Sequence, residues 1–428
     1  MRCEKVGGVD CSYFDAGRCR SCTLLPVPMI TRVESQQAEV ADLLAPFWDT
    51  GEEGATAENR AAEEERSART TEQTWLPPVV GPESGFRIKV KMVVAGTTEH
   101  PTLGILDEDG AGIDLTDCPL YPESIHTVIR ILPWLIKRAQ VPPYNVRKRK
   151  GQLKHVIVTA GDDNRVMVRF VLASQSALPR IQEHLPAFMD ACEGVEVFSV
   201  SANINPVHTA IIEGDEEIAL HGPQWLPVTQ GRVQLKVRPQ SFVQTNTAVA
   251  SGLYEQVREW VSNAQVPATS HDRRLTVWDL FCGVGGFALH VAGPSRLVTG
   301  VEVAPAAVES ALEVAHGAER DATGEGDLGL NFICADAAQW ARQQSQMPDV
   351  LIVNPPRRGM GEDMAGWVEQ SGIPHVIYSS CNPRTLAADL TKMPGYRIEQ
   401  ARFLDMFPHT SHAEVVVRLA RQAGGRTD

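Results

Sequence analysis

The chain has 428 residues and a formal net charge of −13, with 43% hydrophobic, 6% aromatic and 22% charged residues. These proportions exclude a wholly disordered chain, a collagen and a coiled coil. The length suffices for about two to three domains. The acidic total argues against a protein that simply coats nucleic acid. No apolar run approaches the ~18 residues of a membrane span and the N-terminus lacks the apolar core of a signal peptide, so we expect a soluble, cytoplasmic protein with no membrane partner.

Cysteines dominate the N-terminal segment, 1–33. Cys19 and Cys22 have the spacing that lets two thiolates hold one metal, and Cys11 lies eight residues before Cys19. Cys118, in a turn-like Asp-Cys-Pro-Leu-Tyr context, can supply a fourth ligand. An iron–sulfur cluster and a zinc site both fit three or four thiolates. Free core thiols are the alternative, but Cys19 and Cys22 lie among polar neighbours, which favours a metal centre.

The next segment, 34–75, is acidic. Between residues 34 and 73 there are eleven acidic residues and only three arginines, which together account for eight of the thirteen net negative charges. The core of this stretch, residues 51–73, is rich in Ala, Glu, Ser and Thr and nearly free of large apolar residues, so it cannot bury enough surface to offset its ordering entropy. The sequence therefore predicts a disordered insert or a frayed helix, and it leaves the rest of the chain close to neutral.

Two basic stretches follow. Arg87, Lys89 and Lys91 alternate with apolar residues, so a strand there would place three cations on one face. Residues 137–154 contain seven basic residues and no acidic one, and Tyr144 within this run could stack on a base. One basic run is usually a solvated surface, but two in one domain of an acidic protein favour a surface for an anionic ligand.

The C-terminal third alternates short apolar runs with helix-like stretches, the pattern of a doubly wound α/β sheet. The predicted strands are 275–278, 297–302, 331–336 and 350–354. The first strand runs into Asp279-Leu-Phe-Cys-Gly-Val-Gly-Gly-Phe, a glycine loop that opens a helix and lets a ligand approach the backbone closely. Glu302, which ends the second strand, suits the diol of a ribose.

Two features favour S-adenosylmethionine over a dinucleotide, whose enzymes also use such loops. Asp279 enters the loop, where it would repel a pyrophosphate. The fourth strand ends in Asn354-Pro-Pro, which is typical of methyltransferases that act on bases. Arg357 and Arg358 follow in place of the aromatic residue of amino-methylating enzymes, which disfavours adenine-N6 chemistry.

A cysteine and a glutamate complete the candidate site. An apolar strand delivers Cys381 into a polar turn at the carboxyl edge of the sheet, which favours a nucleophile over a structural thiol. Glu414 begins another apolar strand, and partial burial there would raise its pKa toward that of a general base, with pairing to an arginine as the alternative. His409 and His412 could act as acid, ligand or packing residues, and their spacing does not decide among these roles.

Taken together, these segments resemble bacterial RNA uracil-C5 methyltransferases, and among them the branch that methylates 23S ribosomal RNA. The resemblance spans nearly the whole chain and is carried, in the family's order, by the Cys11-x7-Cys19-x2-Cys22 opening, GFRIKVKMVV, DCPLYP, RPQSFVQTN, WDLFCGVGGF, VNPPRRG, YSSCN and DMFPHTSHAE. It implies an α/β fold with a class I (Rossmann-like) S-adenosylmethionine methyltransferase domain at 236–428, a central α+β RNA-binding domain at 76–235 and an iron–sulfur N-terminal region. It also implies a monomer whose target is uridine 747 of 23S rRNA.

The resemblance assigns the site residues by position. It implies Cys381 as nucleophile and Glu414 as base, S-adenosylmethionine contacts at Gln244, Phe281, Glu302 and Asn354, and [4Fe–4S] ligands at Cys11, Cys19, Cys22 and Cys118.

The expected chemistry needs one thiolate and one carboxylate. Uracil C5 is a poor nucleophile, and addition of the Cys381 thiolate to C6 would make C5 reactive toward a sulfonium methyl group. Glu414 would then take the C5 proton, and the uridine must be flipped into the pocket. A cytosine-C5 enzyme is a second candidate, although such enzymes usually present the cysteine after a proline and Ser380 precedes Cys381 here. A uracil-C5 enzyme for a different RNA uridine is a third, and a non-catalytic iron–sulfur or zinc RNA-binding protein is a fourth.

Overall fold

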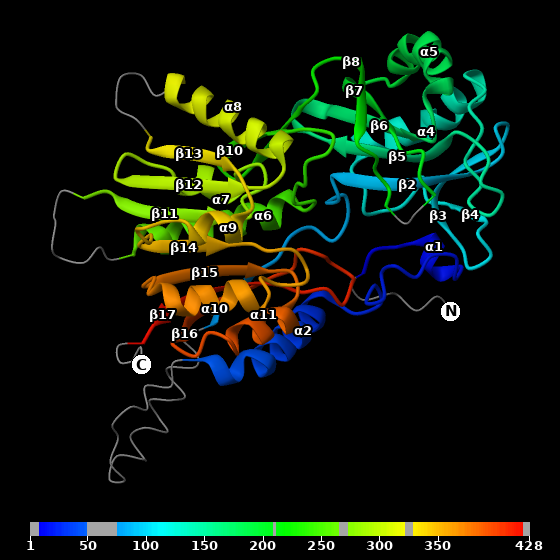
Figure 1. Ribbon diagram of the computed structural model, residues 1–428. Coiled ribbons are helices and arrows are strands. Elements are labelled where there is room, and N and C mark those ends of the chain that lie inside the picture. Colours follow the sequence, from blue (N-terminus) through cyan, green and yellow to red (C-terminus); the bar gives the residue numbers. More distant parts are fainter. Residues whose placement is uncertain (1–7, 49–74, 209–210, 265–272, 322–327, 423–428) are drawn as a thin grey trace, which may run out of the picture. The chain divides into compact units, whose positions relative to one another are not determined.

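The computed structural model describes residues 8–48, 75–208, 211–264, 273–321 and 328–422 (Figure 1). The chain forms two compact units that alternate along the sequence. The first unit contains Met1–Leu25, Pro82–Gln230 and Gln234–Thr247. The second contains Pro26–Gly81, Gly231–Val233 and Ala248–Asp428.

A seven-stranded sheet forms the body of the first unit, with the strand order β4-β3-β2-β5-β6-β7-β8. Its strands are β2 (Lys89–Gly96), β3 (Pro101–Leu106), β4 (Gly112–Asp114), β5 (Leu153–Ala160), β6 (Arg165–Leu172), β7 (Glu196–Ile204) and β8 (Glu216–His221). Helices α4 (Glu123–Arg138) and α5 (Leu178–Ala191) pack on one face, where alternate strand residues such as Val90, Met92 and Val94 are buried with them. This part of the chain also contains a short helix, α1 (Ser12–Asp15), the two-stranded pair β9 (Leu226–Gln230) and β10 (Val233–Val237), and two 3-10 turns at Asp162–Asn164 and Gln175–Ala177.

An eight-stranded sheet forms the second unit, with the order β1-β16-β17-β15-β14-β11-β12-β13. Its strands are β1 (Trp75–Val79), β11 (Leu275–Leu280), β12 (Arg296–Glu302), β13 (Leu330–Cys334), β14 (Val350–Val353), β15 (His375–Ser380), β16 (Tyr396–Leu404) and β17 (Glu414–Arg421). Strands β11 to β15 run parallel, whereas β17 is antiparallel to both β15 and β16. The strands predicted from the sequence between residues 275 and 354 are all present, within two residues of their expected limits.

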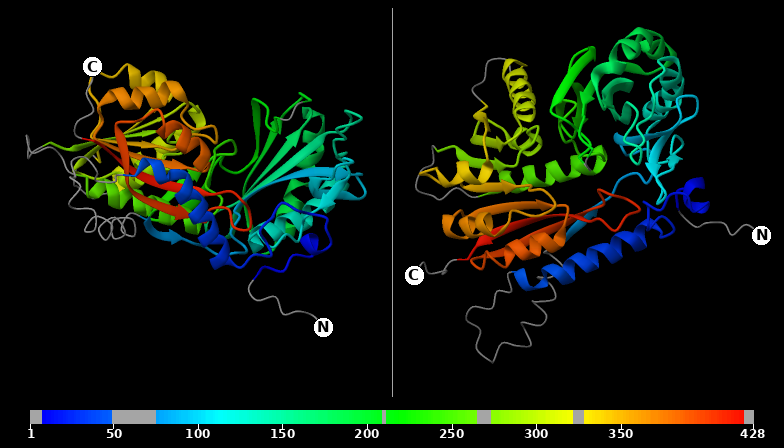
Figure 2. Two further views of the ribbon diagram at one scale, coloured as in Figure 1. Left: turned by 90° about the horizontal axis from the view of Figure 1, so that it is seen from below. Right: turned by 45° about the vertical axis from the view of Figure 1, so that its right-hand side comes forward.

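Helices cover both faces of this sheet (Figure 2). One face packs against α2 (Met29–Leu44), α9 (Ala337–Arg342), α10 (Glu362–Ser371) and α11 (Pro383–Leu390), and the other against α6 (Thr247–Ser262), α7 (Gly286–Val291) and α8 (Pro305–Asp321). Alternate residues of β11 serve the two cores, with Trp278 and Leu280 on one face and Leu275 and Val277 on the other. This is the predicted doubly wound α/β arrangement.

The acidic segment differs in part from its prediction. Residues 34–44 lie in helix α2, followed by a short 3-10 turn at Ala45–Phe47, rather than in a disordered insert. Val33, Val40 and Leu44 recur at helical spacing and are buried against the second unit, so this stretch has an apolar face that its acidic composition masks. Residues 49–74, the most acidic part, lie outside the described residues.

Segment boundaries also differ from those expected. Helix α2 and strand β1 belong to the second unit, although the sequence grouped them with the cysteine segment, the acidic insert and the central domain. The reason is packing, because α2 lies against α11 and β1 pairs in parallel with β16. The boundary expected at residues 235 and 236 falls inside β10.

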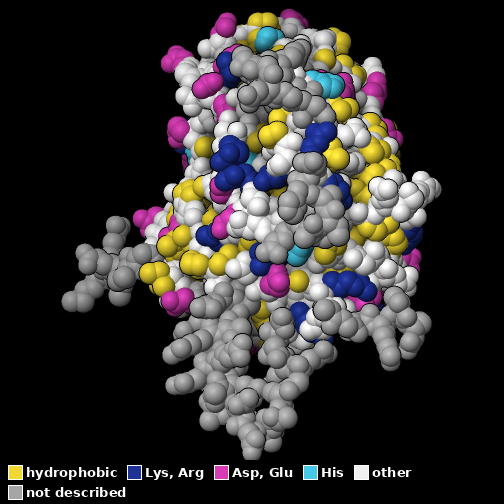
Figure 3. Space-filling view, turned by 90° about the vertical axis from the view of Figure 1, so that its left-hand side faces the viewer, with side chains coloured by type: hydrophobic (Ala, Val, Ile, Leu, Met, Phe, Trp, Pro, Cys, Tyr) yellow, Lys and Arg dark blue, Asp and Glu magenta, His cyan; other side chains and the backbone are white. Residues whose placement is uncertain are grey.

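Charged side chains are mixed on the face drawn in Figure 3, wherever grey atoms do not cover it: basic, acidic and hydrophobic groups alternate there. In Figure 1 this is the side on which β11 and β12 begin. The predicted functional residues of the second unit lie at the opposite edge of its sheet. Among the described helices, none has the length and apolar character needed to cross a membrane.

Candidate active site

Five sequence-predicted residues lie at one edge of the second unit's sheet. Phe281 and Asn354 follow the carboxyl ends of β11 and β14, and Glu302 ends β12, which is parallel to β11. Cys381 follows β15. Glu414 begins β17, and because β17 runs antiparallel to β15, its first residue lies at the same edge. Ligands bind outside the carboxyl ends of the strands in this type of sheet.

Cys381 and Glu414 are neighbours by register. Ser380 of β15 pairs with Val415 of β17, so the next position in this antiparallel ladder places Cys381 opposite Glu414. The carboxylate is close enough to act on the thiol electrostatically, because it contributes to raising the cysteine pKa. Cys381 and Glu414 therefore lie on adjacent strand ends, and their roles as nucleophile and base stay predictions.

Glu414 is buried and has a single polar contact of note. Its side chain is 1% exposed, and its Oε1 accepts a hydrogen bond from the Ser379 hydroxyl at 2.8 Å. Burial raises the pKa of Glu414 to about 7, and the Ser379 hydrogen bond opposes that shift only in part. No arginine pairs with Glu414 within the described part of the chain. That part of the structure therefore does not contain the carboxylate–arginine pair that was the alternative. A carboxylate with a pKa near neutrality suits a general base.

The Cys381 thiol is held in its protonated form at rest. Burial raises its pKa first, the Glu414 carboxylate raises it further, and the Arg357 guanidinium acts in the opposite direction. Arg357 is held in place through its own carbonyl, which accepts hydrogen bonds from Asn382 Nδ2 at 3.1 Å and Thr385 Oγ1 at 3.2 Å. Arg357, which follows Asn-Pro-Pro, therefore lies near Cys381.

The glycine loop has the backbone that close ligand approach requires. Gly285 has a φ of +84°, and a Cβ there would lie 2.9 Å from the Phe332 ring, so only glycine fits. Phe281 is one of the non-glycine residues in the left-handed region, with a φ of 64°. Glu302 braces the loop, since its Oε2 accepts from the Gly283 amide and its Oε1 from the Ala304 amide, each at 3.0 Å. Each of these oxygens keeps a lone pair for a ribose hydroxyl.

Asp279 does not act as the sequence argument supposed. The residue is fully buried, its Oδ2 accepts from the Ala288 amide of α7 at 2.9 Å, and burial raises its pKa to about 8. A carboxyl that is largely protonated at neutral pH offers little charge to repel a pyrophosphate. Its role visible here is to join β11 to the start of α7.

Gln244 belongs to the first unit, whereas the three remaining residues expected to contact S-adenosylmethionine and the two catalytic residues belong to the second. It is 7% exposed, and its carbonyl accepts a hydrogen bond from Gln230 Nε2 at 2.8 Å. It lies three residues before α6 begins. Its assignment as a cofactor contact stays a prediction.

The four cysteines expected to bind metal meet in the first unit. Cys11, Cys19, Cys22 and Cys118 line one small cavity, and the fold brings them together because the buried Tyr13 accepts a hydrogen bond from the Asp117 amide at 3.0 Å. Burial raises the pKa of Cys22 to about 11, with the other three cysteines as further causes. No three His, Cys, Asp or Glu side chains of the described residues form a ready site for a metal ion. The metal-binding role of these four cysteines therefore stays a prediction.

A buried ion pair near the edge escaped the sequence analysis. Arg32 of α2 donates to Asp405 Oδ2 at 2.7 Å, and its other terminal nitrogen lies 3.4 Å from His409 Nδ1. Gln36, one turn further along α2, donates to the carbonyls of Thr410 and His412. The partners are more than 370 positions apart in the chain, so no local pattern could have paired them.

The two histidines thus separate in environment. His409 is wholly buried beside Arg32, which favours the packing role. The His412 side chain is exposed, and its Nδ1 lies 2.9 Å from the Arg357 side chain. Its pKa is lowered, first by the partial loss of solvent around the ring and second by the charge of Arg357. His412 therefore belongs to the surroundings of Cys381.

The two basic stretches also differ. Lys89 and Lys91 do share a face of β2, as predicted, but Lys89 donates to the Ser241 carbonyl and Lys91 forms an ion pair with Glu213, each at 2.7 to 2.8 Å. Residues 147–150 are exposed in the loop before β5. The second stretch is therefore the better candidate for contacts with an anionic ligand.

Comparisons with known proteins agree with this site. The family model described as tRNA (Uracil-5-)-methyltransferase matches residues 341–422, which include Cys381 and Glu414. The 23S rRNA (uracil(747)-C(5))-methyltransferase RlmC of Escherichia coli O9:H4 (strain HS) is 42% identical over 97% of this chain and 100% of the relative, and that of Shigella boydii serotype 4 (strain Sb227) is 41% identical with the same coverage.

A solved structure shares the fold. The crystal structure of Pyrococcus abyssi tRNA (uracil-54, C5)-methyltransferase in complex with S-adenosyl-L-homocysteine matches with a TM-score of 0.70 and 22% identity, over 94% of this chain and 86% of that one. The α/β methyltransferase fold and the two near-full-length relatives lead to one conclusion. This chain belongs to the RlmC family of RNA uracil-C5 methyltransferases.

Proposed function

We propose that this protein transfers a methyl group from S-adenosylmethionine to C5 of a uridine in 23S rRNA, namely uridine 747, the target named for its relatives. The single observation that carries the reaction is the register that sets Cys381 opposite a buried Glu414 at the carboxyl edge of the sheet. We further infer that the protein acts as a monomer in the cytoplasm, where ribosomal RNA would be its partner.

Proton transfer from the thiol begins the proposed sequence. Cys381 passes its proton to the solvent, and the thiolate adds to C6 of the flipped uracil, so that the electrons of the C5–C6 double bond move onto C5 and the C4 carbonyl. Arg357 favours the thiolate, because it is the group that lowers the Cys381 pKa. S-adenosylmethionine, when bound, would supply the methyl group that C5 takes up, and with its sulfur–methyl bond broken it would leave as S-adenosylhomocysteine.

Glu414 completes the sequence. Its carboxylate removes the C5 proton, the C5–C6 double bond re-forms, and the C6–sulfur bond breaks to return the thiolate. The Ser379 hydroxyl holds one carboxylate oxygen at 2.8 Å and leaves the other for this proton. Glu414 needs to be ionised for this step, and its pKa of about 7 permits that at neutral pH.

Three of the proposed S-adenosylmethionine contacts lie at the same edge: we assign Glu302 to the ribose hydroxyls, and Phe281 and Asn354 to further contacts. Gln244, in the first unit, is assigned to the cofactor only by the resemblance of its SFVQTN segment. The left-handed backbone at Phe281 and the glycine at 285 support an approach of the ligand to the main chain.

A [4Fe–4S] cluster bound by Cys11, Cys19, Cys22 and Cys118 is part of this proposal. Four thiols around one cavity, from two distant segments, are the donor set that such a cluster takes. No redox step is needed for the methyl transfer, so we assign the cluster to ordering the N-terminal segment on the first unit. Iron and sulfide analysis of protein purified without oxygen tests it: four of each per chain are expected, whereas zinc without iron would refute the cluster.

The reaction is tested by comparing Cys381→Ala and Glu414→Gln with the natural protein. Mass-spectrometric mapping should show 5-methyluridine at position 747 of 23S rRNA only with the natural protein. Cys381→Ala should retain S-adenosylmethionine binding without turnover. Glu414→Gln should accumulate a protein–RNA adduct that survives denaturation, since the C5 proton stays in place. Full activity of Cys381→Ala would instead favour a non-catalytic site, and an unchanged RNA map would overturn the target.

A further inference from the structure

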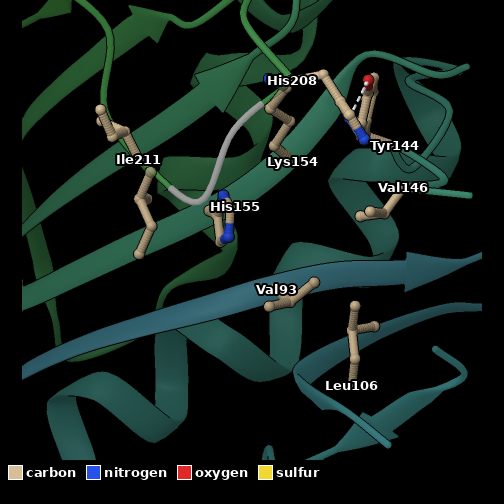
Figure 4. A pocket seen from close by; sticks show the side chains of 9 residues that line it. Val93, Leu106, Tyr144, Val146, Lys154, His155, His208 and Ile211 are labelled. Carbon is tan, nitrogen blue, oxygen red and sulfur yellow. Dashed lines mark hydrogen bonds between the residues drawn. The ribbon is translucent and has the colours of Figure 1, made fainter. Parts of the chain in front are cut away.

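A cavity of about 410 Å³ lies in the first unit, away from the residues assigned above (Figure 4). It lies on the face of the seven-stranded sheet opposite α4 and α5. Met92 and Val94 are buried with those helices, so Val93 between them points to the other face, where it lines the cavity. Aliphatic side chains make up the rest of its apolar wall.

An irregularity in β5 supplies two polar groups to this cavity. Leu153 pairs with Leu172 and His155 with Val171, so Lys154 is an extra residue in the ladder between β5 and β6. Such a bulge breaks the strict alternation of side chains along a strand. As a result Lys154 and His155, adjacent in the sequence, both line the cavity.

An aromatic pair lines one end. The Tyr144 hydroxyl lies 3.2 Å from His208 Nδ1, and the two rings stand 6.2 Å apart at 46°. Lys154 Nζ lies 4.9 Å from the centre of the Tyr144 ring and donates to the Val207 carbonyl at 2.7 Å. The tyrosine ring is therefore held from two sides, which orients it before any ligand arrives.

His155 adds a polar group that nothing in the described residues satisfies. Its Nδ1 is buried without a hydrogen-bond partner. Burial, with Lys154 and Lys91 adding to the effect, lowers its pKa to about 4, so the ring is neutral at physiological pH. A neutral imidazole has one donor and one acceptor, the pair that the edge of a base can match.

Cations stand at the rim. Tyr144 begins the loop that continues into Arg147, Lys148, Arg149 and Lys150, all of them exposed. Among these four, the only ion pair in the described residues joins Arg147 to an almost fully exposed Asp109 at 3.9 Å, which is a weak contact. The rim is thus positively charged in a chain whose total charge is negative.

We propose that this cavity binds one unstacked nucleotide of the RNA substrate, with its base against Tyr144 and His208 and its neighbouring phosphates on residues 147–150. An aromatic platform beside a basic strip is the arrangement by which proteins hold single-stranded nucleic acid. The inference rests on the proposed function, and it adds a second nucleotide-binding position on the first unit. It implies that the substrate presents another unpaired base besides the target uridine.

Binding of a 23S rRNA hairpin that carries uridine 747 tests this, measured by fluorescence anisotropy with S-adenosylhomocysteine present. Tyr144→Ala should weaken binding by about fivefold to a hundredfold, as expected for loss of one base stack, and Tyr144→Phe should stay close to the natural protein. Trp134→Ala is the matched control, because Trp134 is a 39% exposed aromatic residue on α4, which covers the other face of the sheet.

The salt dependence of binding separates stacking from phosphate contacts. Tyr144→Ala should leave the slope of log Kd against log salt unchanged, whereas Lys148→Ala should reduce it by about one. Melting temperatures check folding, and His208→Ala, at an exposed position, provides a second variant that should weaken binding if Tyr144→Ala is unstable.

The outcomes are distinct. Unchanged affinity of Tyr144→Ala and His208→Ala, with methylation by the natural protein intact, would refute the nucleotide cavity and leave the proposed function standing. Equal loss in Tyr144→Phe and Tyr144→Ala would also refute it, because the phenylalanine ring can still stack. A natural protein that neither binds nor methylates the hairpin would refute the proposed function itself.

Discussion

Two protons decide the chemistry at the scale of single residues. Cys381 and Glu414 lie side by side in a buried setting, and burial raises the pKa of both groups. Under the roles proposed for them, the pKa of the base is thereby brought near neutrality, while the nucleophile keeps its proton until a substrate is in place. A cysteine that is a thiol at rest is protected from adventitious oxidation, since the thiolate is the reactive form.

The pH profile should report Glu414. Because the base acts only when ionised, kcat should rise about tenfold more steeply per pH unit below pH 7 than above it, where only the Cys381 thiol still titrates. Single-turnover methylation rates between pH 5.5 and 8.5, at saturating RNA and S-adenosylmethionine, measure this. Ser379→Ala is the matched variant: it removes the hydrogen bond that lowers the Glu414 pKa, so its profile should shift toward higher pH. A rate independent of pH below 7 would contradict the assignment of this base.

At the scale of elements, helix α2 connects the N-terminal part of the chain to the loop that precedes Glu414. Arg32 and Asp405 form a pair in which both side chains are almost completely buried, at 0% and 3% exposure. Removing one partner of such a pair leaves an uncompensated charge in the core. The loop between β16 and β17 is therefore held by a helix that is remote in sequence.

Arg32→Met should both destabilise the protein and slow the reaction. Loss of one buried partner costs about 3–5 kcal/mol, and a displaced loop should lower kcat at least about tenfold with little change in the KM for S-adenosylmethionine. Urea unfolding and steady-state kinetics at 20 °C measure the two effects. Ile30→Ala, on the same helix at a 67% exposed position, should change neither. The double variant Arg32→Met/Asp405→Leu should recover stability, and an effect no larger than that of Ile30→Ala would exclude a positioning role.

The elements also show how far sequence patterns reach. The predicted strands of the second unit follow from apolar runs that both faces of a parallel sheet bury, and Cys381 and Glu414 were found because each adjoins such a run. Most of helix α2 was assigned to the acidic segment because the boundary at residue 34 followed the charge of the whole segment and not the apolar spacing of Val33, Val40 and Leu44. The Arg32–Asp405 pair could not be predicted, since it depends on how two distant elements pack.

Stability at the scale of the whole molecule should depend on pH through the same acid. The pKa of Glu414 rises from an ordinary 4.5 to about 7 on folding, so its contribution is fully present below pH 4.5 and is lost as the pH rises through 7. The Glu414→Gln variant cannot ionise at this position, so it does not lose stability in this way as the pH rises. Relative to the natural protein it should be more stable by about 3 kcal/mol at pH 8, and the advantage should vanish near pH 4.

Urea unfolding at both pH values provides this measurement. Other groups also change the stability with pH. The lowered pKa of His155, for example, makes the folded state more favourable as the pH rises to 6.5. Because both proteins contain these groups, their effects cancel in the difference between the two free energies of unfolding. A difference that is the same at pH 4 and pH 8 would mean that Glu414 titrates normally in the folded protein.

The pairing of β1 with β16 has a consequence for the order in which the protein is made. Trp75 of β1 pairs with Ala401 of β16. Strand β1 and helix α2 are therefore synthesised more than three hundred residues before the elements against which they pack. The first unit ends at Thr247 and can close while synthesis continues. Until the last strands emerge, the apolar faces of α2 and β1 stay uncovered, and nascent chains stalled before residue 396 should therefore be the form that chaperones must protect.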